Sequence, residues 1–252
     1  ALVLFGLSIL IFVLVRVMPG DTARMALGAR ASEEAVEALR QEMHLNESYV
    51  VQYGYWISGM LSGDFGESVI TKRPVIEDIK SYLPATMELV VLAAFFLILF
   101  GIVLGVISTK YAGKWQDNFI RILSYFGIVA PAFLWAVLIM LVFAYVFPIL
   151  PTSGRISAWM SAPPNVTGMY ILDYLLDGNF SGAWDAFTHI IMPSAVLAFG
   201  GISQGARITR SSMIENIGKP YASAEKSYGI PERKILFKYL LKPSMNATIT
   251  TM

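Results

Sequence analysis

Few residues of the chain have the types and spacing that catalysis needs. Ser203 lies in a Gly-x-Ser-x-Gly pattern over 201–205, the pattern of the nucleophile elbow in hydrolases. The elbow works only on a sharp strand-to-helix turn with a histidine and an acid in reach, but here it lies in an apolar stretch and the nearest histidine, His189, is 14 residues upstream. We therefore expect no catalytic residue. We interpret Ser203 and Gln204 as polar groups that face another helix or a solute path, and His189 as a partner in a structural hydrogen bond.

The sequence also lacks the residue patterns of metal-binding and phosphate-binding sites. The chain has no cysteine and two histidines, His44 and His189, which excludes a thiolate metal site and a cysteine nucleophile and leaves no expected metal. The Gly-Lys pairs at 113–114 and 218–219 lack the preceding glycine and the following Ser or Thr of a phosphate-binding loop. If ATP drives this protein, another chain must hydrolyse it.

The hydrophobic residues are gathered in blocks. They make up 56% of the 252 residues, and charged residues make up 15%, against about 25% in soluble domains. The blocks 89–109 and 122–154 contain no charge, and 186–206 contains only a histidine. A helix needs about 20 apolar residues to cross a bilayer, so all three blocks qualify as spans. This excludes an ordinary soluble enzyme, a disordered chain and a disulfide scaffold.

The charges between the blocks alternate in sign. Segment 21–80 has ten acidic and six basic residues, and 110–121 has three basic and one acidic. Segment 148–188 has three acidic and one basic, and 207–242 has eight basic and three acidic. Because cytoplasmic loops accumulate Lys and Arg, we expect 110–121 and 207–242 in the cytoplasm and the other two segments outside.

These observations predict an all-α polytopic membrane protein. We expect a truncated first span at 1–18, an extracytoplasmic segment with short helices at 19–84, and a membrane core at 85–252. The core contains spans at about 86–109, 120–147 and 188–211, a cytoplasmic loop at 212–238 and the start of a fifth span at 240–252. Since both ends of the chain stop inside apolar or uncapped sequence, we expect a segment trimmed at both ends.

Local signals add detail to these elements. Ser32 with the two glutamates after it is typical of a helix start, a second apolar helix is expected at 50–61, and 63–66 is expected to form a turn. Pro131 and Pro193 are expected to kink their spans. Two small-xxx-small pairs are expected to let helices pack closely: Gly101 with Gly105, and Gly201 with Gly205.

The cytoplasmic loop encodes a short helix bounded at both ends. Gly218 is expected to end the preceding helix, and Pro220 suits the first position of a new one. Gly229 suits the left-handed residue after a helix, and Pro231 follows two positions later. The small residues at 222–224 would let a partner surface come close. A solvated basic loop needs no helix bounded in this way, so we favour a docking element.

The ordered motifs of this loop resemble those of the binding-protein-dependent ABC importer permeases, and in particular the first permease subunit of the peptide, oligopeptide and nickel group. The motifs are Ala-Arg-Ile-Thr-Arg-Ser-Ser-Met at 206–213, Pro-Tyr at 220–221 and Gly-Ile-Pro-Glu-Arg-Lys at 229–234. Other matching pieces run the length of the chain: Pro-Gly-Asp at 19–21, Gly-Asp-Phe-Gly at 63–66, 83–89, Ala-Pro-Ala-Phe at 130–133 and His-Ile-Ile-Met-Pro at 189–193. Of the family's Glu-Ala-Ala-x-x-x-Gly coupling pattern, Ala224 and Gly229 match.

The resemblance implies the transmembrane domain of a type I ABC importer, with about five of six spans in this chain. It implies a bacterial or archaeal cytoplasmic membrane, a second homologous permease, two cytoplasmic ATPase subunits that bind ATP and Mg²⁺, and an extracytoplasmic solute-binding protein. It implies no cofactor in this chain and no nucleic acid partner. The residues that would couple to the ATPase are Tyr221, Ala222, Ser223, Ala224, Glu225, Lys226, Ser227, Tyr228, Gly229, Ile230 and Pro231.

Two other classes stay open at this point. A secondary transporter would place an ionisable residue near the middle of a span, and none of the three complete spans has one centrally. An intramembrane hydrolase depends on the Gly-x-Ser-x-Gly match alone. The solute, whether a dipeptide, an oligopeptide, a nickel chelate or an oligosaccharide, is not encoded in a recognisable way.

Overall fold

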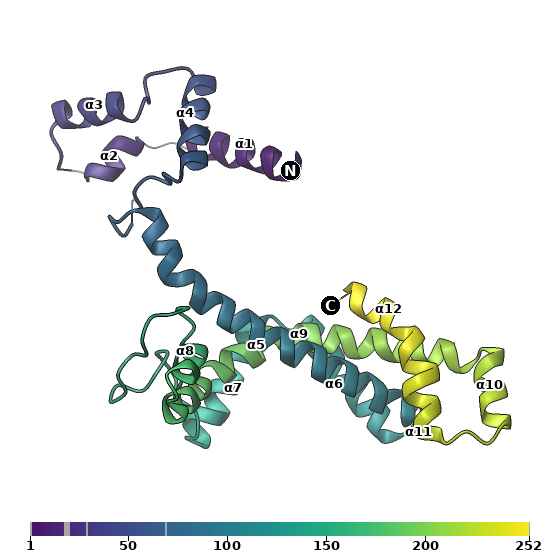
Figure 1. The fold of residues 1–252 in the computed structure, drawn as a ribbon. Coiled ribbons are helices and arrows are strands. Elements are labelled where there is room, and N and C mark those ends of the chain that lie inside the picture. Colours follow the sequence, from purple (N-terminus) through teal and green to yellow (C-terminus); the bar gives the residue numbers. More distant parts are fainter. Residues whose placement is uncertain (1, 18–20, 29, 69, 252) are drawn as a thin grey trace. The chain divides into compact units, whose positions relative to one another are not determined.

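The computed structural model describes residues 2–17, 21–28, 30–68 and 70–251 (Figure 1). Within these residues the secondary structure is helical, apart from an isolated bridge between Glu67 and Pro74. The chain divides into two compact units, Ala1–Tyr82 and Leu83–Met252. The motif residues Pro19 and Gly20 lie outside the described residues.

The first unit contains four helices before the start of α5. They are α1 (Leu2–Val17), α2 (Thr22–Leu27), α3 (Glu33–Glu42) and α4 (Tyr49–Ser62). As expected, the Ser32 side chain caps α3 by accepting a hydrogen bond from the Ala35 amide, and α4 ends at Gly63, which is left-handed at φ +88°. The Phe12 ring packs edge-on against the Tyr53 ring, with 5.3 Å between the ring centroids, so the apolar α1 contacts α4.

The second unit holds the long helices. Helix α5 (Val75–Lys110) begins in the first unit and its residues from Leu83 on belong to the second. It is followed by α6 (Trp115–Val129), α7 (Ala132–Met140), the π-helical η1 (Leu141–Val146) and α8 (Tyr170–Leu176). The remaining elements are α9 (Phe180–Ile217), α10 (Pro220–Ser227), α11 (Glu232–Lys234), the π-helical η2 (Ile235–Leu241) and α12 (Lys242–Thr251).

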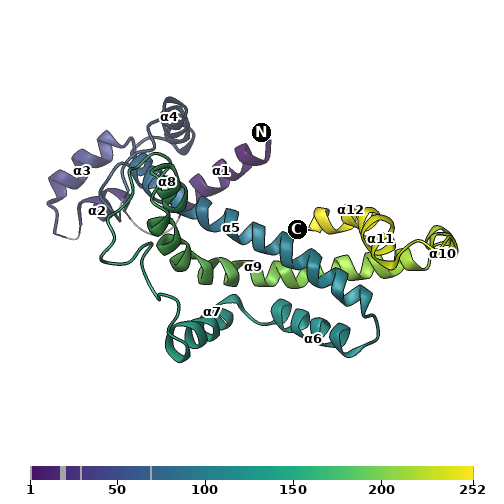
Figure 2. The same ribbon diagram turned by 60° about the horizontal axis from the view of Figure 1, so that its bottom comes forward.

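Helix α9 is the element on which this unit is assembled. Helices α6, α7, α8 and α12 all contact it, and Figure 2 shows α9 running along α5 and α6 with α12 folded back against its end. α9 buries mostly small residues, including Ala198, Ser203, Gly205 and Ala206. Small side chains suit a membrane helix with many neighbours, because they let backbones approach where lipid supplies no hydrophobic driving force.

Two helices are long and apolar enough to cross a membrane, α5 and α9, among the residues described. The apolar block expected as one span at 120–147 consists of two helical segments, Trp115–Val129 and Ala132–Val146, bent by 114° at the break between them, as in a broken span or a re-entrant loop. The physical reason is Pro131, which has no N–H to donate and forces Ala130 before it into an extended conformation at ψ 135°. At Pro193, by contrast, α9 continues as a single element.

Candidate coupling surface and membrane core

The short helix expected in the loop 212–238 has the bounds that the sequence predicts. Helix α9 ends at Ile217, with Gly218 after it, and α10 begins at Pro220. Gly229 is left-handed at φ +73°, and the Ile230 amide donates back to the Glu225 carbonyl at 3.3 Å. A left-handed residue closing the helix in this way is favourable for glycine and costly for a residue with a side chain.

The helix has an inner and an outer face. Ala222 is buried in an apolar cluster with Val106 of α5, Met213 of α9, and Leu236 and Leu240 of η2. Ser223 and Ala224 are exposed, and Tyr228 is 83% exposed. Of the three small residues expected to face a partner, Ala222 therefore faces the protein's own core, and the outer face holds the other two. The side chain of Lys226 lies outside the described part of the chain.

A chain of hydrogen bonds joins α10 to both neighbouring helices. The Tyr221 hydroxyl donates to Asn216 Oδ1 at 2.8 Å, and Asn216 Nδ2 donates to Ser244 Oγ of α12 at 2.8 Å. Asn216 and Ser244 are buried, so the bond between them is shielded from water, whereas the bond from Tyr221 is only partly buried. Tyr221, Asn216 and Ser244 therefore link α10 to both α9 and α12.

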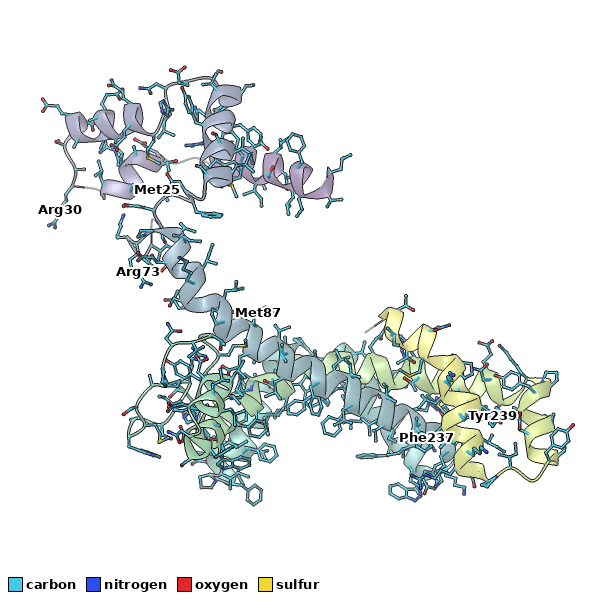
Figure 3. The ribbon with its side chains drawn as sticks, in the orientation of Figure 1. Met25, Arg30, Arg73, Met87, Phe237 and Tyr239 are labelled. Carbon is cyan, nitrogen blue, oxygen red and sulfur yellow. The ribbon has the colours of Figure 1, made fainter. Side chains whose placement is uncertain are left out.

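A groove lies along α11 and η2, the elements that follow α10 in the chain. It has a volume of about 490 Å³ and is lined by Pro231, Phe237, Arg233, Lys234 and Lys238. Phe237 is half exposed, and Figure 3 shows Phe237 and Tyr239 projecting from different sides of η2. An apolar floor with a basic rim is a surface that suits a protein partner with an apolar side chain and acidic neighbours.

An ion pair that was not anticipated from the sequence joins α6 to α9. Arg210 donates from Nε and Nη2 to the two oxygens of the Asp117 carboxylate, at 2.6 and 2.7 Å. Ser108 Oγ of α5 and the Gly113 amide donate to the same carboxylate, at 2.5 and 3.0 Å. The Asp117 side chain is 1% exposed, and these four hydrogen bonds compensate for the burial of its charge.

The candidate path residues differ in their surroundings. Ser203 is 3% exposed and packs on Gly127 of α6, where an added Cβ would lie 2.0 Å from Ser203 Oγ. Gln204 is partly exposed and accepts a hydrogen bond from Arg207. His189 is buried, and its Nδ1 lies 2.8 Å from the Asp185 carbonyl, the geometry of the structural hydrogen bond expected for it. Because Ser203 is mid-helix, it is not at a strand-to-helix turn.

The glycine pairs lie at close helix contacts. A Cβ at Gly105 of α5 would be 2.5 Å from the Thr209 Cβ of α9, and one at Gly201 would be 2.3 Å from Leu97 Cδ1. Gly101 and Gly205 are buried. A side chain at position 105 would push α5 away from α9, because the atoms it meets are near the backbone rather than at a flexible tip.

A second polar network joins Glu88 of α5 to residues of the segment 148–188, which the loop charges assign to the extracytoplasmic side. Glu88 accepts from the Ile171 amide at 2.6 Å and from Arg155 at 2.9 Å, and Arg155 also covers the Tyr170 ring. Nearby, Asp173 accepts three hydrogen bonds from Thr167 and Gly168. Burial raises the pKa of the Asp173 carboxyl, but these hydrogen bonds outweigh burial and hold that pKa below its usual value. These contacts order the irregular loop before α8.

The long apolar helices α5 and α9 define a helical membrane protein. Two family models match: the binding-protein-dependent transport system inner membrane component over residues 98–252, and the N-terminal region of such membrane components over 1–90. The chain belongs to this family. It is a multi-pass permease subunit of an ABC importer, not an enzyme, and its system includes an ATPase and a solute-binding protein.

Relatives across the full chain agree. The chain is 36% identical over 251 residues to the probable D,D-dipeptide transport system permease protein DdpB of Escherichia coli, covering 100% of this chain and 74% of that protein. It is 32% identical over 250 residues to the dipeptide transport system permease protein DppB of Alkalihalophilus pseudofirmus, covering 99% and 75%. It is 29% identical over 245 residues to the glutathione transport system permease protein GsiC of Salmonella typhimurium, covering 97% and 71%. The resemblance stated from the motifs is confirmed.

Proposed function

We propose that this permease imports small peptides across the cytoplasmic membrane of a bacterium or archaeon, paired with a second homologous permease and driven by two ATPase subunits. The proposal that an ATPase drives this permease depends mainly on how α10 is attached to the rest of the unit. On the outer face of α10, Ser223, Ala224 and Tyr228 are exposed, while its inner face and Tyr221 tie it to α5, α9 and α12. A partner that seats on the outer face can therefore move the helices as rigid bodies.

The cargo part of this proposal draws on the relatives. The three relatives are named for transport of a D,D-dipeptide, a dipeptide and glutathione, and both of those that are more than 30% identical to this chain are named for dipeptides. Gln204 is a candidate contact for the peptide backbone, because its amide offers both a donor and an acceptor. Ser203 would join it only in a conformation that separates α6 from α9.

Uptake into proteoliposomes tests the function. The vesicles contain the complete transporter, and the solute-binding protein is outside with a radiolabelled dipeptide. We expect uptake that needs ATP on the cytoplasmic side and the binding protein outside, and that a protonophore leaves unchanged. Uptake driven by a proton gradient without ATP would instead establish a secondary transporter. ATP-dependent uptake of another solute with no uptake of any dipeptide would overturn the cargo assignment alone.

A further inference from the structure

A cavity of about 230 Å³ lies between α5, α6 and α9 on the side that the loop charges assign to the cytoplasm. Its wall is rich in hydrogen-bond donors from all three helices. Three arginines and several hydroxyl groups contribute, including Arg121, Ser124, Tyr125, Arg207, Arg210 and Ser211. A cavity with this lining binds an anion rather than an apolar group or a cation.

The cavity retains positive charge after its internal ion pair is counted. The Asp117 carboxylate is bound by both nitrogens of Arg210, so these two charges cancel. Arg207 donates to the neutral amide oxygen of Gln204, and Arg121 has no acidic partner among the residues that the structure describes. Two guanidinium groups are therefore available to an anion at this site.

An apolar strip runs along α6 beside the cavity. Trp115, Phe119, Ile122 and Phe126 recur at helical spacing and are each more than half exposed. Tyr125, which is half exposed and lines the cavity, is next to Phe126 of the strip in sequence, and Arg121 is next to Ile122. A basic pocket between membrane helices, next to a strip that can contact acyl chains, has the two parts that an anionic lipid requires.

We propose that this cavity binds the phosphate group of an anionic phospholipid from the cytoplasmic leaflet, with its acyl chains along the α6 strip. Arg121 and Arg207 contact the phosphate oxygens, and the Ser124 and Ser211 hydroxyls complete the donor set. Such a lipid would rest against the contact of α6 with α9, which must move in transport. The proposal concerns lipid binding and holds whatever the transported solute is.

The test measures phosphatidylglycerol binding to the complete purified transporter by native mass spectrometry. The double variant Arg121→Gln with Arg207→Gln removes the two available charges. Since the glutamine variant loses two charged donors to the phosphate, we expect the affinity for the tightest-bound lipid to fall by about tenfold or more. The matched control, Lys110→Gln with Lys114→Gln, removes two charges at the connection between α5 and α6, outside the cavity lining, and should leave that affinity within about twofold.

Two further arms separate the sources of the phosphate and guard against misfolding. The variant Arg121→Lys with Arg207→Lys keeps both charges and should recover much of the lipid binding that the glutamine variant loses. Inorganic phosphate at the concentration of the lipid should not displace phosphatidylglycerol, because it lacks acyl chains. Displacement by inorganic phosphate would overturn the lipid assignment, and equal lipid binding by the wild type and the glutamine variant would overturn the site.

Discussion

The hydroxyl of Tyr221 on α10 donates a 2.8 Å hydrogen bond to the side-chain oxygen of Asn216 at the end of α9. Asn216 is buried and also bonds Ser244 of α12, so this hydroxyl links α10 to two core helices. Since the Ala222 methyl group is inserted in the adjacent core cluster, α10 is attached by both a polar and an apolar contact.

Replacing Tyr221 by phenylalanine should loosen this attachment. The loss of one hydrogen bond of about 0.5–1.5 kcal/mol predicts amide exchange across α10 that is about two- to tenfold faster, and less solute moved per ATP hydrolysed. Hydrogen-exchange mass spectrometry and paired uptake and ATPase assays measure the two effects. For the exchange measurement Tyr228→Phe is the control, because the Tyr228 side chain is 83% exposed. Equal protection in Tyr221→Phe and the wild type would show that the bond does not hold the helix.

Substitution of Gly229 by valine should abolish transport while the protein still inserts in the membrane. A β-branched residue at φ +73° is strained by at least about 1–2 kcal/mol, so α10 can no longer end where it does. Gly218→Ala is the matched control, because Gly218 has φ −75° and a Cβ there meets its nearest atom at 3.6 Å. Uptake assays with membrane-fraction immunoblots decide the matter, and normal uptake by the valine variant would refute the requirement.

The Asp117–Arg210 pair predicts an asymmetric response to mutation. Arg210→Met leaves a buried carboxylate unmatched and should destabilise the transporter by about 3 kcal/mol, whereas Asp117→Leu with Arg210→Met should cost clearly less. The folded fraction after heating, measured by gel filtration, reports both. Arg233→Gln, at an exposed arginine, is the control and should match the wild type. A double variant less stable than Arg210→Met would contradict this account of the pair.

The outer loop should weaken in acid because of Asp173. The hydrogen bonds from Thr167 and Gly168 lower the folded-state pKa of this carboxyl, so their stabilisation is present above the unfolded pKa of about 3.9 and is lost as the pH falls below it. Amide exchange at Thr167 and Gly168, corrected for its intrinsic pH dependence, should lose protection below about pH 4. In Asp173→Asn this loss should be absent, since no carboxyl remains to titrate. A wild-type loop equally protected at all these pH values would oppose the assignment.

The bounds of α10 could be predicted from the sequence because Pro220 and Gly229 act on their own backbones. The faces of α10 could not be predicted, because the burial of Ala222 depends on Leu236 and Leu240, which η2 brings back to it. The ion pair was missed for the same reason. In the sequence, Asp117 and Arg210 are 93 residues apart and count only as charges of two different loops. The packing of α6 on α9 brings them together.

The bend at Pro131 could be predicted only in part from the sequence. Proline and the residue before it predict a break, but hydropathy alone merges α6, α7 and η1 into one span. The contacts of Glu88 with Arg155 and Ile171 could not be predicted from the sequence either. Glu88 is a residue at a span end in the sequence, and its partners Arg155 and Ile171 come from a loop without a periodic pattern.

The docking of the ATPase on the outer face of α10 is the central claim, and site-directed cross-linking tests it most directly. The chain contains no cysteine, so single cysteines can be placed at Ser223, Ala224 or Ala222 without background from this chain. With a cysteine-scanned ATPase surface in the complete transporter, Ser223→Cys and Ala224→Cys should cross-link, and Ala222→Cys, whose side chain is buried, should not. Cross-linking of Ala222→Cys alone, or of none of the three, would contradict the claim.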